Sequence, residues 1–334
     1  MGGLNGYLSE NEVSMELIVS AHAGLGNQLF QYAAMLYYGK RFGPKKTAMI
    51  KPPKDANSYG FPRPFLLSHF SIKTPIRELS PAERLLIYRD PLLKAILTPI
   101  RLPFQIEVFT EDYALRYSFS PDIPVGRSVR RLYLVGYWQT YKMVEEVAAD
   151  LRSELVLRRS PQQKTVEVLQ QIRRSKNPVS IHVRRGDSTI AATKCVGLPI
   201  EYYLRNIDEC QQRLDNPTFF VFSDEMRFAK EYLPRNINAV FVEHNDDFSA
   251  HEDLILMSSC RHHIIANSTF SWWGAWLSPG SDKMVFAPKQ WYQTKDSYYP
   301  ELLPPSWILV DTASYLQPSS HVIQGGLLPR FHVS

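Results

Sequence analysis

The distribution of hydrophobic and polar residues divides the chain into an irregular first half and a regular second half. In the second half, short runs rich in β-branched and aromatic residues alternate with longer segments of helical periodicity. This alternation predicts a doubly wound α/β fold, because parallel strands need crossover helices between them. The predicted strands are 179–183, 218–222, 239–242, 263–266 and 283–287, and the predicted helices are 201–214, 225–233, 250–260 and 271–277.

The first half opens with a predicted strand at 17–19, which runs through a glycine-containing turn into a helix. Gly24 and Gly26 permit a ligand to approach the backbone near the positive end of that helix, although a tight structural turn explains them equally well. The spacing is neither GxGxxG nor a Walker loop, so the turn alone identifies no nucleotide class. The helix has one apolar face, formed by Leu29, Ala33, Leu36 and Tyr37.

The segment 52–124 has no sustained periodicity, because prolines interrupt every long run, and we predict short helices and loops there. A core strand is predicted at 132–139, followed by helices within 143–155 and 158–177, and a domain boundary is expected near 156–177. Aromatic residues at the end of this strand fit a hydrophobic core more commonly than a sugar-stacking surface. They are Tyr137, Trp138 and Tyr141.

The composition narrows the class of protein. With 334 residues, of which 44% are hydrophobic and 21% charged, the chain is long enough for two globular domains and is neither disordered nor fibrous. Its net charge of +5 comes from scattered basic residues, which argues against a nucleic-acid surface and is compatible with an anionic ligand. Cys195, Cys210 and Cys260 are odd in number and lack CxxC spacing, so reduced thiols are expected.

The sequence also bears on location in the cell. No run of roughly 18 apolar residues is present, and the first residues lack the basic-then-apolar layout of a secretory signal. We therefore expect a cytoplasmic protein without a transmembrane segment, for which peripheral membrane association stays open. Residues 1–14 are polar and aperiodic, and we expect them to form a disordered extension.

Polar residues follow three of the predicted strands in the second half. The carboxyl ends of parallel strands meet at one edge of a sheet, where nucleotides bind in open α/β folds. We therefore expect these residues to lie together. They are Arg184, Arg185 and Asp187 after the first strand, Ser223 and Asp224 after the second, and Asn267, Ser268, Thr269 and Ser271 after the fourth.

Each of these groups has a second interpretation. The guanidinium groups of Arg184 and Arg185 suit bidentate contact with phosphate, whereas a surface ion-pair cluster with Asp187 is the structural alternative. Asp224 is suited to accept hydrogen bonds from a base or a ribose, or to cap a helix. The hydroxyls around Ser268 suit a diphosphate, or likewise cap the helix that follows. The clustering of three such groups at one sheet edge favours the ligand site.

Four motifs occur in order between Met15 and Val310: GLGNQLFQYA at 24–33, HVRRGD at 182–187, FSDE at 222–225 and NSTFSWWGAWL at 267–277. Together they resemble the bacterial and animal α-1,2-fucosyltransferase family. The resemblance implies a GT-B fold, in which two Rossmann-like domains face each other across a cleft. It also implies inverting transfer of L-fucose from GDP-β-L-fucose to the 2-hydroxyl of a terminal β-galactoside, which forms an α-1,2 linkage.

The resemblance further implies roles for particular residues. Arg184 would hold the donor diphosphate, with Arg185 beside it and with His182 and Asp187 flanking the pair. Asp187 would be the catalytic base or would orient Arg184, and both roles stay open. Asp224 would contact guanine or ribose. The remaining residues expected at the donor are Ser223, Asn267, Ser268, Thr269 and Ser271 in the second domain, and Gly26 and Asn27 across the cleft.

Two positions depart from the family pattern and affect the expected shape of the acceptor site. Ser188 stands where an aromatic residue is usual, and Ala23 stands where a glycine is common. The chain has no Asp-x-Asp motif, so we expect neither a metal nor another cofactor. Arginine charge would then stabilise the departing diphosphate.

The implied organisation consists of the extension 1–14, an acceptor-side domain at 15–160, a GDP-sugar-binding domain at 177–312 and a tail at 313–334. The expected partners are GDP-fucose and a galactose-terminated glycan, without nucleic acid, and no oligomeric state is predicted. Two alternatives stay open. One is a fucosyltransferase of another linkage or another GDP-sugar transferase, since the donor motifs do not identify the acceptor. The other is a non-catalytic glycan-binding module.

Overall fold

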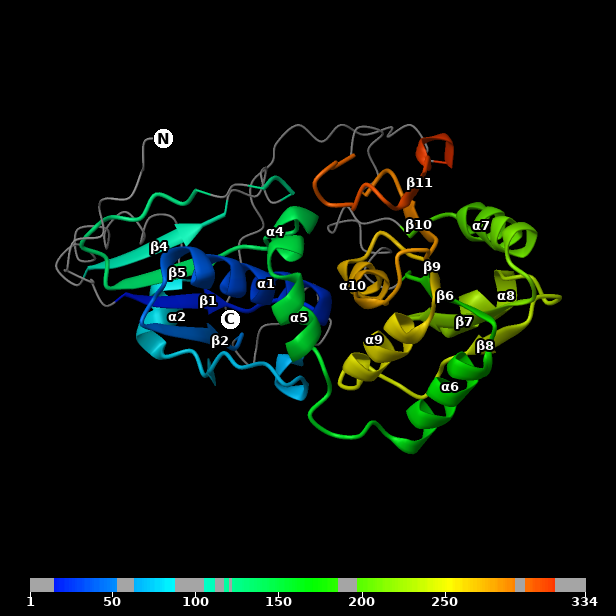
Figure 1. Cartoon of the computed structure of the whole chain (residues 1–334), viewed down its shortest axis with the longest axis horizontal. Helices are drawn as coiled ribbons and strands as arrows, with labels where there is room; N and C mark the ends of the chain where they lie inside the picture. The colour runs from blue at the N-terminus through cyan, green and yellow to red at the C-terminus, as the bar shows by residue number, and fades with distance from the viewer. Residues whose placement is uncertain are drawn as a thin grey trace, which may run out of the picture.

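Two α/β domains, each with a parallel sheet, lie side by side along the long axis of the molecule (Figure 1). The structure is a computed structural model and describes residues 15–52, 63–87, 105–111, 117–119, 122–185, 197–291 and 298–315. The sheet of the first domain has five parallel strands in the order β3-β2-β1-β5-β4. They are β1 (Glu16–Ser20), β2 (Lys46–Ile50), β3 (Ile76–Arg77), β4 (Ile106–Thr110) and β5 (Arg131–Val135).

The sheet of the second domain has six parallel strands in the order β11-β10-β9-β6-β7-β8. This arrangement confirms the predicted doubly wound sheet. Five of its strands match the five predicted segments, and β11 was missed. The strands are β6 (Asn177–Val183), β7 (Pro217–Ser223), β8 (Ala239–Phe241), β9 (His262–Ile264), β10 (Val285–Pro288) and β11 (Ile308–Val310).

Helices cover both sheets. The helix predicted at 143–155 is divided into two at Val147, whose φ of −119° and ψ of 19° leave the helical region. The helices are α1 (Leu25–Phe42), α2 (Pro81–Ile87), α4 (Tyr141–Glu146), α5 (Ala148–Glu154), α6 (Gln163–Arg174), α7 (Ile200–Arg213), α8 (Met226–Tyr232), α9 (Ala250–Ser259) and α10 (Thr269–Leu277), with 3₁₀ turns at η1 (Leu67–His69) and η5 (Ala313–Tyr315).

The prediction of only short helices and loops at 52–124 was wrong, because β3 and β4 lie in this segment. Both strands are at the edges of the first sheet and are only partly buried. Edge strands tolerate a neighbouring proline, since one side of the strand needs no hydrogen-bonded partner. Pro75 accordingly precedes β3, and its carbonyl oxygen accepts a hydrogen bond from the amide of Met49 in β2.

The two sheets share one topological feature, a reversal of strand order beside the first strand of each. The reversal lies between β1 and β5 in the first sheet and between β6 and β9 in the second. Ligands of open α/β sheets bind beyond the carboxyl ends of the strands at such switch points. Each domain therefore has one switch point at which a ligand is expected, and α1 and α10 lie where the two domains pack together.

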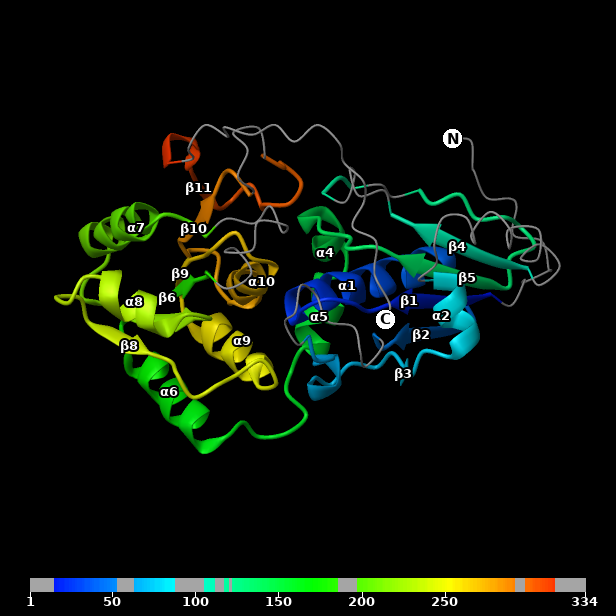
Figure 2. The ribbon, with the colours of Figure 1, turned by 180° about the vertical axis from the view of Figure 1, so that it is seen from behind.

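A continuous hydrophobic core joins the domains through α1 and α10, which lie side by side in both views (Figures 1 and 2). The ring of Phe30 in α1 is 4.7 Å from that of Trp272 and 5.1 Å from that of Trp273 in α10. The indole of Trp276 also donates to Glu145 of α4 at 2.8 Å. A large apolar contact of this kind holds two domains in one relative orientation. The two Rossmann-like domains of the predicted GT-B fold are thus confirmed.

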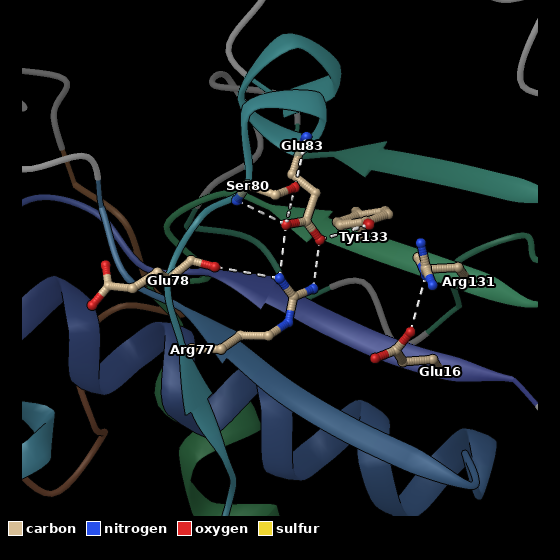
Figure 3. Close-up of polar contacts among 7 residues, drawn as sticks. All are labelled: Glu16, Arg77, Glu78, Ser80, Glu83, Arg131 and Tyr133. Atoms are coloured by element: carbon tan, nitrogen blue, oxygen red, sulfur yellow. Dashed lines mark hydrogen bonds and ion pairs between the residues drawn. The ribbon is translucent and has the colours of Figure 1, made fainter.

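An ion-pair cluster fastens α2 to the first sheet (Figure 3). The guanidinium of Arg77 donates to Glu83 at 2.7 Å, and Ser80 and Tyr133 donate to the same carboxylate at 2.7 Å and 2.9 Å. Burial opposes ionisation of Glu83, but these hydrogen bonds outweigh it and lower the pKa of Glu83 to about 2. The cluster satisfies its own charges, so we assign it a structural role.

Candidate active site

Three of the residues predicted at the donor site meet where β6 and β7 end. Nη1 of Arg184 lies 4.0 Å from Oδ2 of Asp224, and the backbone amide of Arg185 donates to Oδ1 of Asp224 at 2.8 Å. The Arg184 and Asp224 side chains are 25% and 31% exposed, so a ligand can reach both. Asp224 does not cap α8, because the N-cap position is Glu225, whose amide donates to the hydroxyl of Ser223 at 3.0 Å.

The two arginines face different partners. The guanidinium of Arg185 lies over the ring of Phe228 in α8, 4.2 Å from its centroid, whereas that of Arg184 approaches Asp224. His182, on β6, is only 5% exposed and packs edge-on against Phe270 with the ring centroids 5.8 Å apart. Burial, together with the charge of Arg184, lowers the pKa of His182 to about 4. His182 is therefore neutral at physiological pH, and its contact with a donor stays a prediction.

At the start of α10, several side chains that were predicted to contact the sugar donor form hydrogen bonds within the fold. The hydroxyl of Ser268 accepts from the amide of Phe270 at 3.3 Å and so caps the helix, as the structural alternative predicted. The hydroxyl of Ser271 donates to the carbonyl oxygen of Ser268 at 3.3 Å and is 2% exposed. The side chain of Asn267 donates to the carbonyl oxygen of Trp291 at 3.1 Å. The positive helix end is the part of this motif best placed for an anion.

Gly26 brings the first domain against this helix end. A Cβ atom at Gly26 would lie 2.5 Å from the amide nitrogen of Phe270 and 2.7 Å from the Thr269 hydroxyl. The glycine is therefore required for packing between the domains, and its contact with a donor stays a prediction. As a result, the positive ends of α1 and α10 converge between the two switch points. Two converging helix N-termini favour a bound anion such as a diphosphate.

In the first domain, polar side chains contact one another around the start of α1. Oδ1 of Asn27 accepts from the side chain of Gln139 at 2.6 Å. His22, which follows β1, contacts the Gln31 amide through its ring and packs edge-on against Tyr137 at 4.8 Å. Burial lowers the pKa of His22 to about 4. Sequence reasoning missed His22, Gln31 and Gln139, although the strand-end argument used for the second domain applies equally to His22.

The loop after β5 is held by Glu111, another residue the sequence did not single out. Its carboxylate accepts from the backbone amides of Tyr137 at 2.6 Å and Trp138 at 3.0 Å. Trp138 is 5% exposed and stacks on Phe109, which confirms the core interpretation for this residue. Tyr137 is only partly buried and stays compatible with contact to a sugar.

Some predictions fall outside the described residues, namely those for Asp187, Ser188 and Cys195. Cys210 and Cys260 are free and buried. Within the described ranges, no three His, Cys, Asp or Glu side chains are grouped as metal ligands would be. Nor does any helix among these residues have the length and apolarity needed to span a bilayer.

The similarity to known proteins extends over most of the chain. A family model described as glycosyl transferase family 11 matches residues 11–310. An alpha-1,2-colitosyltransferase of Escherichia coli is 29% identical over 309 residues, which cover 89% of this chain and 100% of that protein. The galactoside 2-alpha-L-fucosyltransferase SEC1 of Bos taurus is 25% identical over 275 residues, which cover 79% of this chain and 64% of that protein.

Among solved structures, the fucosyltransferase NodZ from Bradyrhizobium aligns with a TM-score of 0.48 and 14% sequence identity, over 80% of this chain and 94% of that one. A similarity this low carries no inference about function. The fold assignment above rests on the strand order and packing of the chain itself.

Proposed function

The chain belongs to glycosyl transferase family 11, and on that basis we propose that it transfers L-fucose from GDP-β-L-fucose, with inversion, to the 2-hydroxyl of a terminal β-galactoside. The observation that carries the proposal is the position of Arg184 beside Asp224, at the carboxyl ends of adjacent strands and next to the switch point between β6 and β9. Relatives named as α-1,2-specific transferases support the linkage.

The chemistry follows from where charge develops. As the bond between fucose and GDP breaks, negative charge grows on the β-phosphate while positive charge grows at the anomeric carbon. A fixed guanidinium at Arg184 stabilises this separated state more than the ground state, because the phosphate carries more charge in it. The converging helix ends at Gly26 and Thr269 add partial positive charge without a titratable group.

Asp224 has a different role in this proposal. Its carboxylate is held by the backbone amide of Arg185 at 2.8 Å, which fixes the position of a hydrogen-bond acceptor at the end of β7. A guanine or a ribose hydroxyl can donate to this acceptor. The donor nucleotide would then lie across β6 and β7 with its diphosphate toward α10, and the first domain would present the acceptor from the side of Tyr137.

The proton of the acceptor hydroxyl requires a destination. We propose Asp187, three positions after Arg184, either as the base that takes this proton or as the carboxylate that orients the arginine. The variant Asp187→Asn separates these roles. Loss of a base removes the acid limb of the pH–rate profile, whereas loss of an orienting carboxylate lowers the rate at every pH.

One experiment tests the proposed reaction. The protein is incubated with GDP-fucose and a panel of β-galactosides without added metal, and the linkage of each product is determined. We expect α-1,2-fucosylated galactosides, and the absence of transfer to every galactoside would refute the proposal. A parallel reaction with a GDP-linked colitosyl donor tests the second candidate, which the 29% identical relative favours. Faster turnover of that donor would reassign the sugar while leaving the site and the linkage in place.

A further inference from the structure

A pocket lies where the two domains and the chain that joins them come together, and none of its lining residues belongs to the candidate active site. Its volume is about 520 Å³. We call it the junction pocket. It is lined by Ser68, His69, Leu157, Arg158, Arg159, Ser160, Pro161, His251 and Glu252.

Hydrogen bonds to both domains fix the walls of the junction pocket. On the first domain, the amide of Arg158 donates to the carbonyl oxygen of His69 at 2.9 Å. The amide of Ser71 donates to the carbonyl oxygen of Val156 at 2.8 Å. On the second domain, the amide of Gln162 donates to the carboxylate of Glu252 in α9 at 3.2 Å. The linker is therefore anchored on both sides, and the pocket is a built part of the fold.

The lining is mainly basic. Arg158 and Arg159 come from the linker, His69 comes from η1, and His251 comes from the first turn of α9. Glu252 is the one acidic residue among the lining residues, and its carboxylate also accepts the backbone hydrogen bond from the linker. Arginine side chains suit phosphate and sulfate groups, because their planar N–H donors can contact two oxygens at once.

The two histidines, one from each domain, are stacked. Their ring centroids are 3.8 Å apart with an interplanar angle of 21°, and His251 is only 8% exposed. Burial lowers the pKa of His251, and the facing His69 lowers it further. Two imidazolium rings this close repel each other, and a bound anion offsets that repulsion. Arg158 and Arg159 add to the repulsion, whereas Glu252 is the lining group that opposes it.

We propose that the junction pocket binds the dianionic phosphate group of a small molecule. Arg158, Arg159, His69 and His251 line one space from three separate segments of the chain, and the guanidinium of Arg158 also donates to the carbonyl oxygen of Ile72 at 3.0 Å. That space is within the range of small-ligand sites and larger than a bare phosphate needs, which points to a phosphorylated small molecule. Bound there, the ligand contacts both domains. The proposal does not depend on the identity of the sugar donor.

Binding of a dianion is linked to protonation of His251. An anion raises the pKa of a nearby imidazole, so binding takes up a proton and tightens as the pH falls. Sulfate is the suitable probe, since it stays dianionic between about pH 6 and pH 8. Its affinity is measured by titration calorimetry on the full chain at constant ionic strength. We expect sulfate to bind several-fold tighter at the lower pH.

Variants locate the site. Arg159→Gln and His69→Gln should each weaken sulfate binding roughly tenfold, because each removes a charge-assisted contact. His251→Gln should also abolish most of the pH dependence. Arg174→Gln, at the exposed end of α6, is the matched control and should bind as the wild type does. Thermal melting of each variant verifies that it is folded.

Three results would overturn the proposal: no sulfate binding by the wild type, equal binding by Arg159→Gln and Arg174→Gln, or binding that is lost in Arg184→Ala and kept in Arg159→Gln. The last result would place the anion at the strand ends. Inorganic phosphate and a hexose phosphate are then compared in the same assay. Tighter binding of the hexose phosphate supports a phosphate carried on a larger molecule, and equal binding would refute that part of the proposal.

Discussion

Replacing Gly26 by alanine tests the contact between the domains. The added Cβ atom would lie 2.5 Å from the backbone of Phe270, which is 0.9 Å short of the 3.4 Å at which ordinary van der Waals contact begins. The two nearest atoms are backbone and cannot rotate away, so α1 and α10 have to separate. Overpacking of this kind costs about 1–3 kcal/mol. We therefore expect Gly26→Ala to lower the free energy of unfolding by that amount.

The larger effect should be on catalysis. If Arg184 and the acceptor side of the first domain are positioned through this contact, a shift near 1 Å misplaces the reacting groups. Misplacement on that scale costs on the order of 100-fold in rate. The measurement is kcat/KM for fucosyl transfer, combined with urea unfolding of the same preparation.

Gly24→Ala is the matched control, two residues away. Gly24 has a φ of −71°, which alanine adopts without strain, and an added Cβ atom would meet only the side chain of Arg63 at 3.8 Å. We expect its stability to stay within about 0.5 kcal/mol of the wild type. Wild-type kcat/KM in Gly26→Ala would refute the reasoning, since it would mean that the helix contact does not position the site. A loss of the same size in Gly24→Ala would also refute it.

Three further predictions concern charge. Arg184→Ala should lower kcat by roughly 10²–10³-fold and keep the wild-type melting temperature, whereas Arg205→Ala on the exposed side of α7 should change neither; near-normal turnover in Arg184→Ala would return Arg184 to a structural role. Activity should persist in excess chelator, because in the proposed mechanism Arg184 supplies the countercharge to the diphosphate; a strict requirement for a divalent cation would contradict this. The pKa of Glu83 is about 2 in the fold against an ordinary value of 4.5. The bond between Glu83 and Arg77 therefore stabilises the fold at pH values above 4.5, and this stabilisation is lost as the pH falls toward 2. Glu83→Gln should therefore cost about 1–3 kcal/mol at neutral pH in urea unfolding and reduce the loss of stability in acid, while the exposed Glu231→Gln should do neither.

The second domain was predictable mainly because its central strands are buried. β6 is buried along its whole length, and its β-branched residues Val179, Ile181 and Val183 indicate a strand that ends just before polar residues. The edge strands β3 and β4 were not predictable in this way. They are short and only partly buried, and prolines nearby disrupt the periodic pattern on which prediction depends.

At the candidate site, features set by local sequence could be predicted, whereas features set by long-range contacts could not. The position of Arg184 beside Asp224 follows from strand order, which local sequence patterns indicate. The role of Gly26 depends on a contact with Thr269 and Phe270, more than two hundred residues away, and no local pattern contains that information. His22 and Gln139 lie close to the ends of predicted strands, but their contacts with Gln31 and Asn27 depend on how the strands pack against α1.

The aromatic core formed by Phe30 with Trp272 and Trp273 has a consequence for engineering chimeras. Recombining the acceptor half of one enzyme with the donor half of another assumes that the halves are interchangeable modules. Here a crossover in the linker would pair α1 from one parent with α10 from the other and leave these rings in a mismatched interface. A productive chimera would need to inherit α1 and α10 from the same parent, so sequence exchange is better confined to the loops around Tyr137.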